Sequence, residues 1–210
     1  MVNIVGRKIG MTQIFRDNGE LVPATVLDLN QWVVLRKKTP ERDGYGAVQV
    51  GLLRQRYWDQ PFSGEWLKKP TRFWAFRCEI EIHENFENIN VGQKIDFAAI
   101  MINGELFDAA GITKGYGFQG VVKRHGFKGG GASHGSQRMG RRTGSIGGHR
   151  SQGKVDKGKK MPGHMGCDLR SIQNLEILKI ELDKGIAFIK GSMPGSAGSL
   201  VSLKRSIGNL

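Results

Sequence analysis

One stretch of this chain, residues 113–166, cannot bury a hydrophobic core of its own. Of its 54 residues, 16 are glycine, 12 are Lys or Arg, and only Asp156 is acidic; it also holds four of the five histidines. A glycine-rich stretch with few apolar groups loses much conformational entropy when it orders and gains little from burial. We therefore expect it to become ordered against an anionic partner.

Almost all of the positive charge of the chain lies in this stretch. Its net charge is +11 (12 minus 1) out of +13, so the other 156 residues carry only +2 (20 basic minus 18 acidic). The phosphates of a folded nucleic acid can supply the ordering force that apolar contacts do not. The sequence thus predicts a nucleic-acid-binding segment, whose candidate contact residues are Lys114, Lys123, Arg124, Lys128, His134, Arg138, Arg141, Arg142, His149, Arg150, Lys154, Lys157, Lys159 and Lys160.

The remaining sequence has the apolar spacing of β-strands. In the clearest case, Trp74, Phe76, Cys78, Ile80 and Ile82 alternate with small or charged residues, which predicts one buried and one solvent-exposed face. Strands are expected at residues 21–29, 32–35, 47–53, 74–82, 175–182, 186–189 and 200–203.

The turns between these strands favour one small closed barrel, because Gly, Asn, Asp and Pro separate short strands that recur about every ten residues. Asp183-Lys184-Gly185 is expected to be a hairpin turn, and residues 60–69 to contain a short helix. We predict a mainly β fold. Residues 1–112 and 167–210 would form the barrel body, with a less regular insertion at about 54–73, and residues 113–166 would form an extended loop.

Neither membrane insertion nor export is predicted. The longest apolar run, residues 97–102, is far shorter than the ~18 residues that a membrane span requires. The N-terminus resembles neither a signal peptide nor a transit peptide, so a reducing, cytosol-like compartment is expected. Cys78 and Cys167 are too few for a disulfide framework, and Cys78 is expected to be a small core residue.

The histidines of residues 113–166 predict no metal site, cofactor or active site. His164 and Cys167 are separated by two residues, but His134 and His149 lack the paired spacing that a four-ligand zinc site requires. A stretch with one acid also lacks the material for a catalytic triad. We expect the histidines to contact phosphates or base edges.

Two glycine motifs fit nucleotide-binding loops only in part. Residues 115–122 match the glycine pattern of dinucleotide-binding folds and kinases, yet no acid follows before Asp156 and the other kinase motifs are missing. Residues 148–154 begin like a P-loop, but Val155 stands where a Ser or Thr must reach magnesium. We therefore predict no enzyme activity and no small-molecule substrate.

Three aromatic residues, Tyr116, Phe118 and Phe127, lie near the start of the basic stretch. We expect them to anchor the root of the loop to the barrel. Stacking on unpaired bases is the alternative.

Ordered motifs along the whole chain resemble a known family. On these motifs the chain resembles the third protein of the large ribosomal subunit, the L3 family, in its bacterial or organellar form; the resemblance is weaker at residues 53–73. The motifs are GRKIGMTQIF at residues 6–15, VPATV at 22–26, DGYGAVQVG at 43–51, TKGYGFQGVVKR at 113–124, SHGS at 133–136, GSIG at 144–147, GKVDKGKKMPGHMG at 153–166 and KGSMPG at 190–195.

This resemblance implies a translation-protein β-barrel and a loop that runs through ribosomal RNA towards the peptidyl-transferase centre. It also implies early binding in large-subunit assembly near the 3′ end of the rRNA, neighbouring large-subunit proteins as further partners, and a cytoplasmic or organellar ribosome as the location. The rival interpretation is a free-standing nucleic-acid chaperone.

The resemblance also assigns roles within the loop. By similarity, residues 144–155 would lie nearest the peptidyl-transferase centre, and Lys157, Lys159 and Lys160 would hold RNA backbone on the return path. Some bacterial members carry a methylated glutamine where Arg150 stands here, so no such modification is expected.

Overall fold

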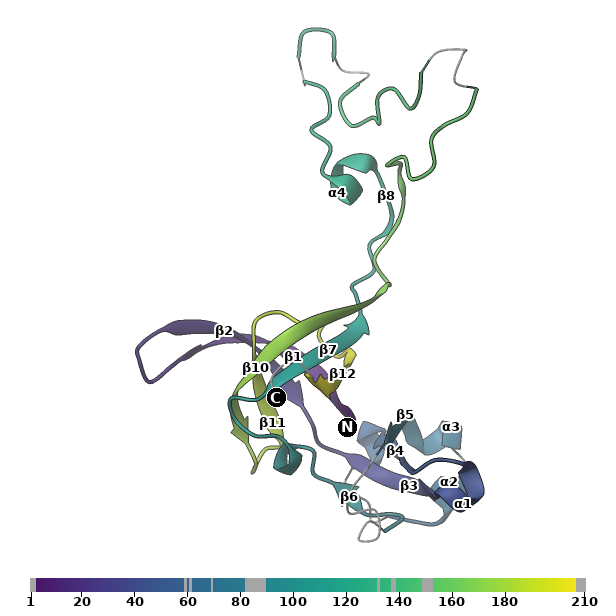
Figure 1. The fold of residues 1–210 in the computed structure, drawn as a ribbon, viewed down its shortest axis with the longest axis vertical. Helices are drawn as coiled ribbons and strands as arrows, with labels where there is room; N and C mark the ends of the chain where they lie inside the picture. The colour runs from purple at the N-terminus through teal and green to yellow at the C-terminus, as the bar shows by residue number, and fades with distance from the viewer. Residues whose placement is uncertain are drawn as a thin grey trace. The chain divides into compact units, whose positions relative to one another are not determined.

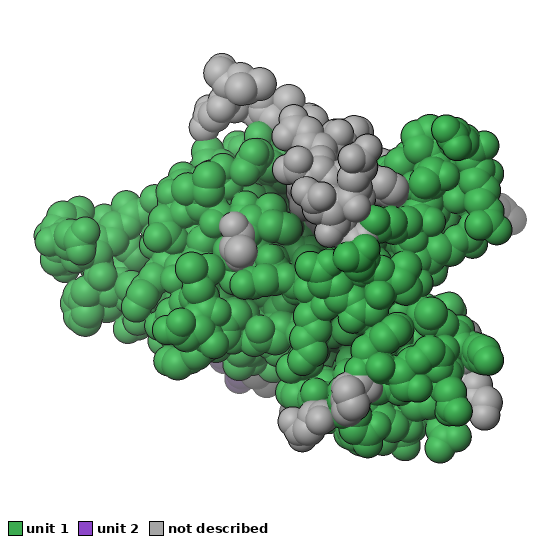
Figure 2. Space-filling model, turned by 90° about the horizontal axis from the view of Figure 1, so that it is seen from below, with its two compact units in different colours: residues 1–112, 169–210 green, residues 113–168 purple. Residues whose placement is uncertain are grey.

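Two compact units make up the protein. The structure, a computed structural model, describes residues 3–58, 60, 62–68, 70–81, 90–131, 133–136, 139–148 and 153–206. Unit 1 comprises Met1–Ile112 and Leu169–Leu210, and unit 2 comprises Thr113–Asp168 (Figure 1). The space-filling view in Figure 2 shows mainly the surface of unit 1, in green.

Six strands of unit 1 close into an antiparallel barrel, in the order β1-β12-β7-β10-β11-β2. Closure leaves no unpaired strand edge in this sheet, so it offers no template for aggregation. The prediction of a mainly β fold is confirmed. The bounds are β1 Asn3–Phe15, β2 Leu21–Asp28, β7 Leu106–Ile112, β10 Leu169–Glu181, β11 Ile186–Lys190 and β12 Leu200–Arg205.

Alternate residues of β11 and β12 fill the core of the barrel. Ala187 and Ile189 of β11 and Val201 and Leu203 of β12 are buried, while the residues between them are partly exposed. This is the two-residue period of a strand with one wet face. The expected hairpin turn after β10 is confirmed, since β10 and β11 pair directly across residues 182–185.

Three strands that we expected in the barrel form a separate sheet, together with a two-residue strand, β6 (Lys94–Ile95), that the sequence did not predict. β3 (Trp32–Lys38), β4 (Ala47–Leu53), β5 (Trp74–Glu81) and β6 pair in the order β5-β4-β3-β6. The single-barrel expectation is wrong for β3, β4 and β5, because alternation fixes which face of a strand is buried and not which sheet the strand joins. The two sheets still share one hydrophobic core.

Short helices occupy the connections of unit 1. The helix expected within residues 60–69 is confirmed as α2, which is only four residues long. Trp66 of α2 packs with Phe73 and Trp74 in a second, smaller core, in which the indole Nε1 of Trp74 donates to the carbonyl of Trp66 at 3.0 Å. The helices are α1 (Pro40–Asp43), η1 (Gln55–Tyr57), α2 (Glu65–Lys68), α3 (Pro70–Phe73) and η3 (Ala98–Ile100).

In unit 1 the sequence did not predict β6 or the longer strands β1 and β7. β1 contains two glycines and a register shift between Lys8 and Gly10, and β7 contains Ala109, Ala110 and Gly111. Glycine and alanine are depleted in strands, so both segments give a weak signal, and their partners in the barrel decide their structure.

The face predicted for β5 is partly wrong. Trp74 and Ile80 are buried, but Phe76 is 41% exposed, and Ile82 lies outside the described residues. Cys78 is half-buried and packs against the core, as predicted. Burial raises the pKa of its thiol to about 11, so Cys78 stays protonated at neutral pH.

Lys8 is a buried cation that ties β1 to the loop before β12. It is 7% exposed, and its Nζ donates to the carbonyls of Met193 at 2.8 Å and Gly195 at 3.3 Å. Its backbone N–H donates to the carbonyl of Ser199 at 2.9 Å. A buried ammonium requires such acceptors, and the carbonyls in turn depend on it as a donor.

We expect Lys8→Met to lower the free energy of unfolding by about 1–3 kcal/mol, because two carbonyls lose their donor while the aliphatic stem remains. Urea denaturation of the full chain measures this change. Lys204→Met, at an exposed position of β12, is the matched control and should alter stability by less than about 0.5 kcal/mol. Equal stability of the two variants would contradict the role assigned to Lys8.

We propose that unit 1 folds without unit 2. Val121 is the only fully buried hydrophobic residue among the residues of unit 2 that the structure describes, so the described core belongs almost wholly to unit 1. A chain that lacks residues 114–165 should therefore unfold in a single cooperative transition when followed by circular dichroism. A gradual loss of signal without a transition would show that unit 1 depends on unit 2.

Candidate nucleic-acid interface

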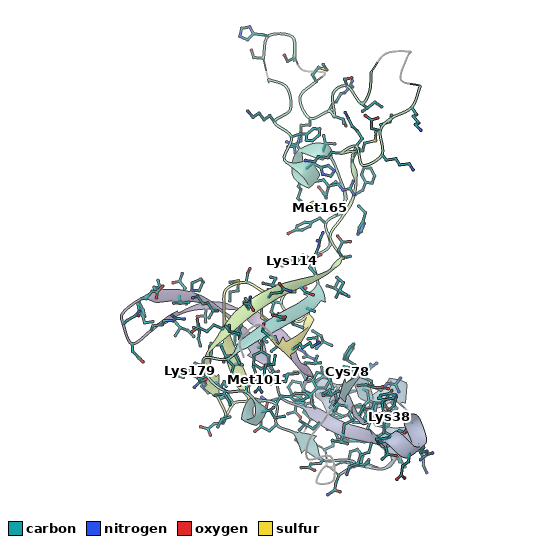
Figure 3. All side chains as sticks on the ribbon, viewed as in Figure 1. Lys38, Cys78, Met101, Lys114, Met165 and Lys179 are labelled. Atoms are coloured by element: carbon teal, nitrogen blue, oxygen red, sulfur yellow. The ribbon has the colours of Figure 1, made fainter. Side chains whose placement is uncertain are left out.

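The root of unit 2 is a short antiparallel ribbon. β8 (Gly117–Gln119) pairs with β9 (Gly163–Met165), with Phe118 opposite His164. Below this pair, Thr113 and Asp168 exchange hydrogen bonds, since the Thr113 N–H donates to the Asp168 carbonyl at 2.9 Å and the Asp168 N–H donates to the Thr113 Oγ1 at 3.2 Å. Figure 3 labels Lys114 and Met165 on the two paths of this root.

The outgoing and returning paths approach so closely that a side chain at Gly166 would collide with backbone, and one at Gly115 would displace the thiol of Cys167. A Cβ on Gly166, which has φ of +84°, would lie 1.9 Å from the carbonyl oxygen of Lys114. A Cβ on Gly115 would lie 2.6 Å from the Sγ of Cys167. Glycine at these sites therefore fixes the spacing of the two paths at the root.

Above the ribbon, helix α4 (Val121–His125) is held against the return path. Gly126 ends the helix in the left-handed conformation, with φ of 71°. The Nη1 of Arg124 donates to the carbonyl of Met161 at 2.7 Å, and the Nε2 of His125 lies 3.0 Å from the same oxygen. One turn of helix thus joins the outgoing path to residues almost forty positions later.

Between α4 and β9 the described residues have an irregular and largely exposed backbone. The N–H of Gly130 donates to the carbonyl of Gly140 at 3.0 Å, and the N–H of Lys159 donates to the carbonyl of Asp156 at 3.4 Å. A Cβ on Gly129 would lie 2.1 Å from the carbonyl oxygen of Gly140, so this contact also requires glycine. Glycine lets two backbone segments come into direct contact here, without side chains between them.

All of the described candidate contact residues are exposed at the surface of unit 2. Arg138, His149 and Arg150 lie outside the described residues. The exposed residues are Lys114, Lys123, Arg124, Lys128, His134, Arg141, Arg142, Lys154, Lys157, Lys159 and Lys160.

The charges of the two units are balanced differently. In unit 1, Lys38 pairs with Glu79 at 2.7 Å and Arg205 with Glu105 at 2.7 Å, and the hydrogen bond from Lys38 lowers the pKa of the Glu79 carboxyl. In unit 2, none of the ten Lys and Arg side chains that the structure describes (12 less Arg138 and Arg150) forms an ion pair with a described carboxylate. Their positive charge is therefore available to a partner.

Two of the candidate contacts also have a role within unit 2. Arg124 uses one of its five N–H donors on Met161, and Lys123 places its Nζ 4.7 Å from the centroid of the Tyr116 ring. Both side chains remain exposed. Their guanidinium and ammonium groups can thus position unit 2 and still meet an anion.

The three aromatic residues have different surroundings. Phe127 is half-buried, with its ring centroid 6.2 Å from that of His125. Tyr116 is 45% exposed beneath Lys123, and Phe118 is 76% exposed. Such exposure does not fit an anchoring role for Phe118, which the sequence interpretation favoured.

A second cationic cluster, in unit 1, is missing from the sequence-based candidates. The Arg56 guanidinium lies 4.8 Å from the centroid of the Tyr57 ring, and that of Arg72 lies 5.6 Å from the Phe73 ring. The Nη2 of Arg56 also donates to the carbonyl of Arg72 at 3.3 Å. An excess of basic residues in the sequence could have revealed this cluster, since residues 54–77 contain six Lys or Arg and two acids. The larger charge of residues 113–166 obscured this excess.

Two other kinds of site are absent from the described residues. No group of three or more His, Cys, Asp or Glu side chains in that part of the chain is arranged to hold a metal ion. No described helix is long and apolar enough to cross a membrane.

Fold and interface together define a class: a β-barrel protein with a glycine-rich cationic extension, the construction typical of proteins that contact nucleic acid. The family model for ribosomal protein L3 matches residues 79–187. Three bacterial proteins named large ribosomal subunit protein uL3 are similar over nearly their whole length. The chain belongs to the ribosomal protein L3 family, and the resemblance seen in its motifs is confirmed.

The similarity to each relative is close and covers both chains. The protein of Pelotomaculum thermopropionicum is 42% identical over 205 residues, which are 97% of this chain and 96% of the relative. That of Lysinibacillus sphaericus is 45% identical over 203 residues, covering 96% and 95%. That of Limosilactobacillus fermentum is 43% identical over 206 residues, covering 97% and 92%.

Proposed function

We propose that this chain is a structural constituent of the large ribosomal subunit and binds the rRNA of that subunit directly through unit 2. The observation that carries the proposal is the set of ten exposed cations without a described carboxylate partner, in a member of the L3 family. The role is scaffolding, and the protein contributes no chemistry of its own. Its location is accordingly the ribosome.

Binding would rest on phosphate neutralisation and on the shape of the RNA. The major groove of A-form RNA is too deep and narrow for side chains to read, so Lys and Arg would contact backbone oxygens and 2′-hydroxyls. The close glycine contacts at Gly166 and Gly129 keep the two paths thin enough to lie between RNA segments.

The finer role follows the family resemblance. We propose that the chain binds early in large-subunit assembly, near the 3′ end of the rRNA, and that unit 2 buttresses the peptidyl-transferase centre. Lys157, Lys159 and Lys160, all exposed on the return path, would hold RNA backbone there. Neighbouring large-subunit proteins would be the remaining partners.

Co-sedimentation tests whether the protein is a resident of the subunit. A tagged full chain, expressed in a bacterium, should migrate with large subunits on a gradient and remain there after a wash in about 1 M salt, where the Debye length is ~3 Å. Retention is expected because a segment threaded into folded RNA cannot leave by charge screening alone. Release into the light fractions would favour the free-standing nucleic-acid chaperone.

Salt dependence tests whether the cations of unit 2 neutralise phosphates. If about 8 to 10 of them do so, the slope of log K against log salt for a large-subunit rRNA fragment should be about −6 to −9. Filter binding of the full chain over a range of salt concentrations gives this slope. A slope no steeper than about −2 would contradict the proposal.

A matched pair of triple variants localises the effect. Replacement of Lys157, Lys159 and Lys160 by Gln should make the slope shallower by about 2 to 3. Replacement of Lys179, Lys184 and Lys190 by Gln removes the same charge from unit 1, where these lysines pair with Glu181 or Glu176. This second triple should leave the slope nearly unchanged.

A further inference from the structure

Phe118 is the most exposed large hydrophobic side chain among the described residues, at 76%. Its backbone is nevertheless well fixed. It lies at the centre of β8, paired with His164 of β9, and the next residue, Gln119, donates from its Nε2 to the carbonyl of Tyr116. A large apolar ring held on a paired strand and left in water indicates a surface that a partner covers.

The surroundings of Phe118 are polar and cationic. His164 is directly opposite on β9 and therefore projects from the same face of the ribbon, and it is exposed. Tyr116 directly precedes β8 and is itself 45% exposed. The Nζ of Lys123 lies over its ring. Along a strand, the residues two positions away share a face, and for Phe118 these are Tyr116 and Gly120. With His164 opposite, this face of the ribbon carries aromatic and polar groups and no aliphatic side chain among these neighbours.

An unpaired nucleobase fits these surroundings better than an apolar protein surface does. A stable contact with a protein would require a wider apolar surface around Phe118. A single planar base, in contrast, can stack on a single aromatic ring. The cations of unit 2 bring RNA phosphates close, and bases that are splayed out of a helix stack on aromatic side chains. The imidazole of His164 stands where it can donate to, or accept from, the edge of a base on that ring.

We propose that Phe118 is a stacking platform for an unpaired nucleobase of the RNA, with His164 at its edge. This inference rests on the proposed function, because it requires RNA at the root of unit 2. Every base has a π-face, so the site confers affinity and register with little preference for one base.

Equilibrium binding of full-length variants to a large-subunit rRNA fragment tests the site. Phe118→Leu keeps an apolar side chain and removes the ring, so it should weaken binding about 5- to 150-fold. Phe118→Trp keeps a stacking surface and should bind within a few-fold of the unchanged chain. Because stacking releases no counterions, neither variant should change the salt slope.

Phe15 offers a matched control. It is 71% exposed on β1 in unit 1, so Phe15→Leu makes the same chemical change at similar exposure and should leave RNA binding unchanged. Thermal unfolding of all three variants confirms that each is folded.

Each outcome separates the two levels of the proposal. If Phe118→Leu binds like the unchanged chain while the Lys157, Lys159 and Lys160 triple loses affinity, the stacking site is wrong and the proposed function stands. If Phe118→Trp loses as much as Phe118→Leu, the ring fits a shaped pocket and does not stack, which also overturns the site. If the unchanged chain itself lacks steep salt-dependent binding, the proposed function fails.

Discussion

Electrostatic repulsion within unit 2 is the constraint on which the rest of the structure depends. Ten described cations crowd a segment in which they meet no described carboxylate, whereas Arg36, Lys38 and Arg205 of unit 1 each have an acidic partner within 3 Å. Repulsion between like charges opposes any compact arrangement of the segment. Under the proposed function, an external polyanion would remove that repulsion, so the same partner would neutralise the charge of unit 2 and order its backbone.

The backbone of unit 2 is organised to keep its two paths together without a core. Gly166 permits a separation of the two paths that a side chain there would block, and the β8–β9 pair continues this close approach. Arg124 donates one hydrogen bond to the carbonyl of Met161, while its side chain remains exposed at the surface. Hydrogen bonds and close backbone contacts thus replace hydrophobic burial as the forces that shape this part of the chain.

Part of this organisation could be predicted from the sequence. Alternation revealed β4, β5 and β11, and composition revealed the cationic segment, because both signals are local. Local signals do not show which sheet a strand joins, so the separate β5-β4-β3-β6 sheet was missed. Local signals also do not show exposure. The sequence around Phe118 does not distinguish a solvent-exposed ring from a buried one.

The cations and the aromatic ring of unit 2 supply interactions of different range. Coulomb attraction acts over about a Debye length, ~8 Å at physiological salt, and is nearly indifferent to where along the RNA a cation lands. Stacking requires direct contact with a base that is unpaired, whatever its identity, so it would fix position once the charges have brought the RNA close. A segment with cations alone would bind RNA in many registers. One ring fixed by the β8–β9 pair, at the root where the backbone is best defined by hydrogen bonds, would select a single register.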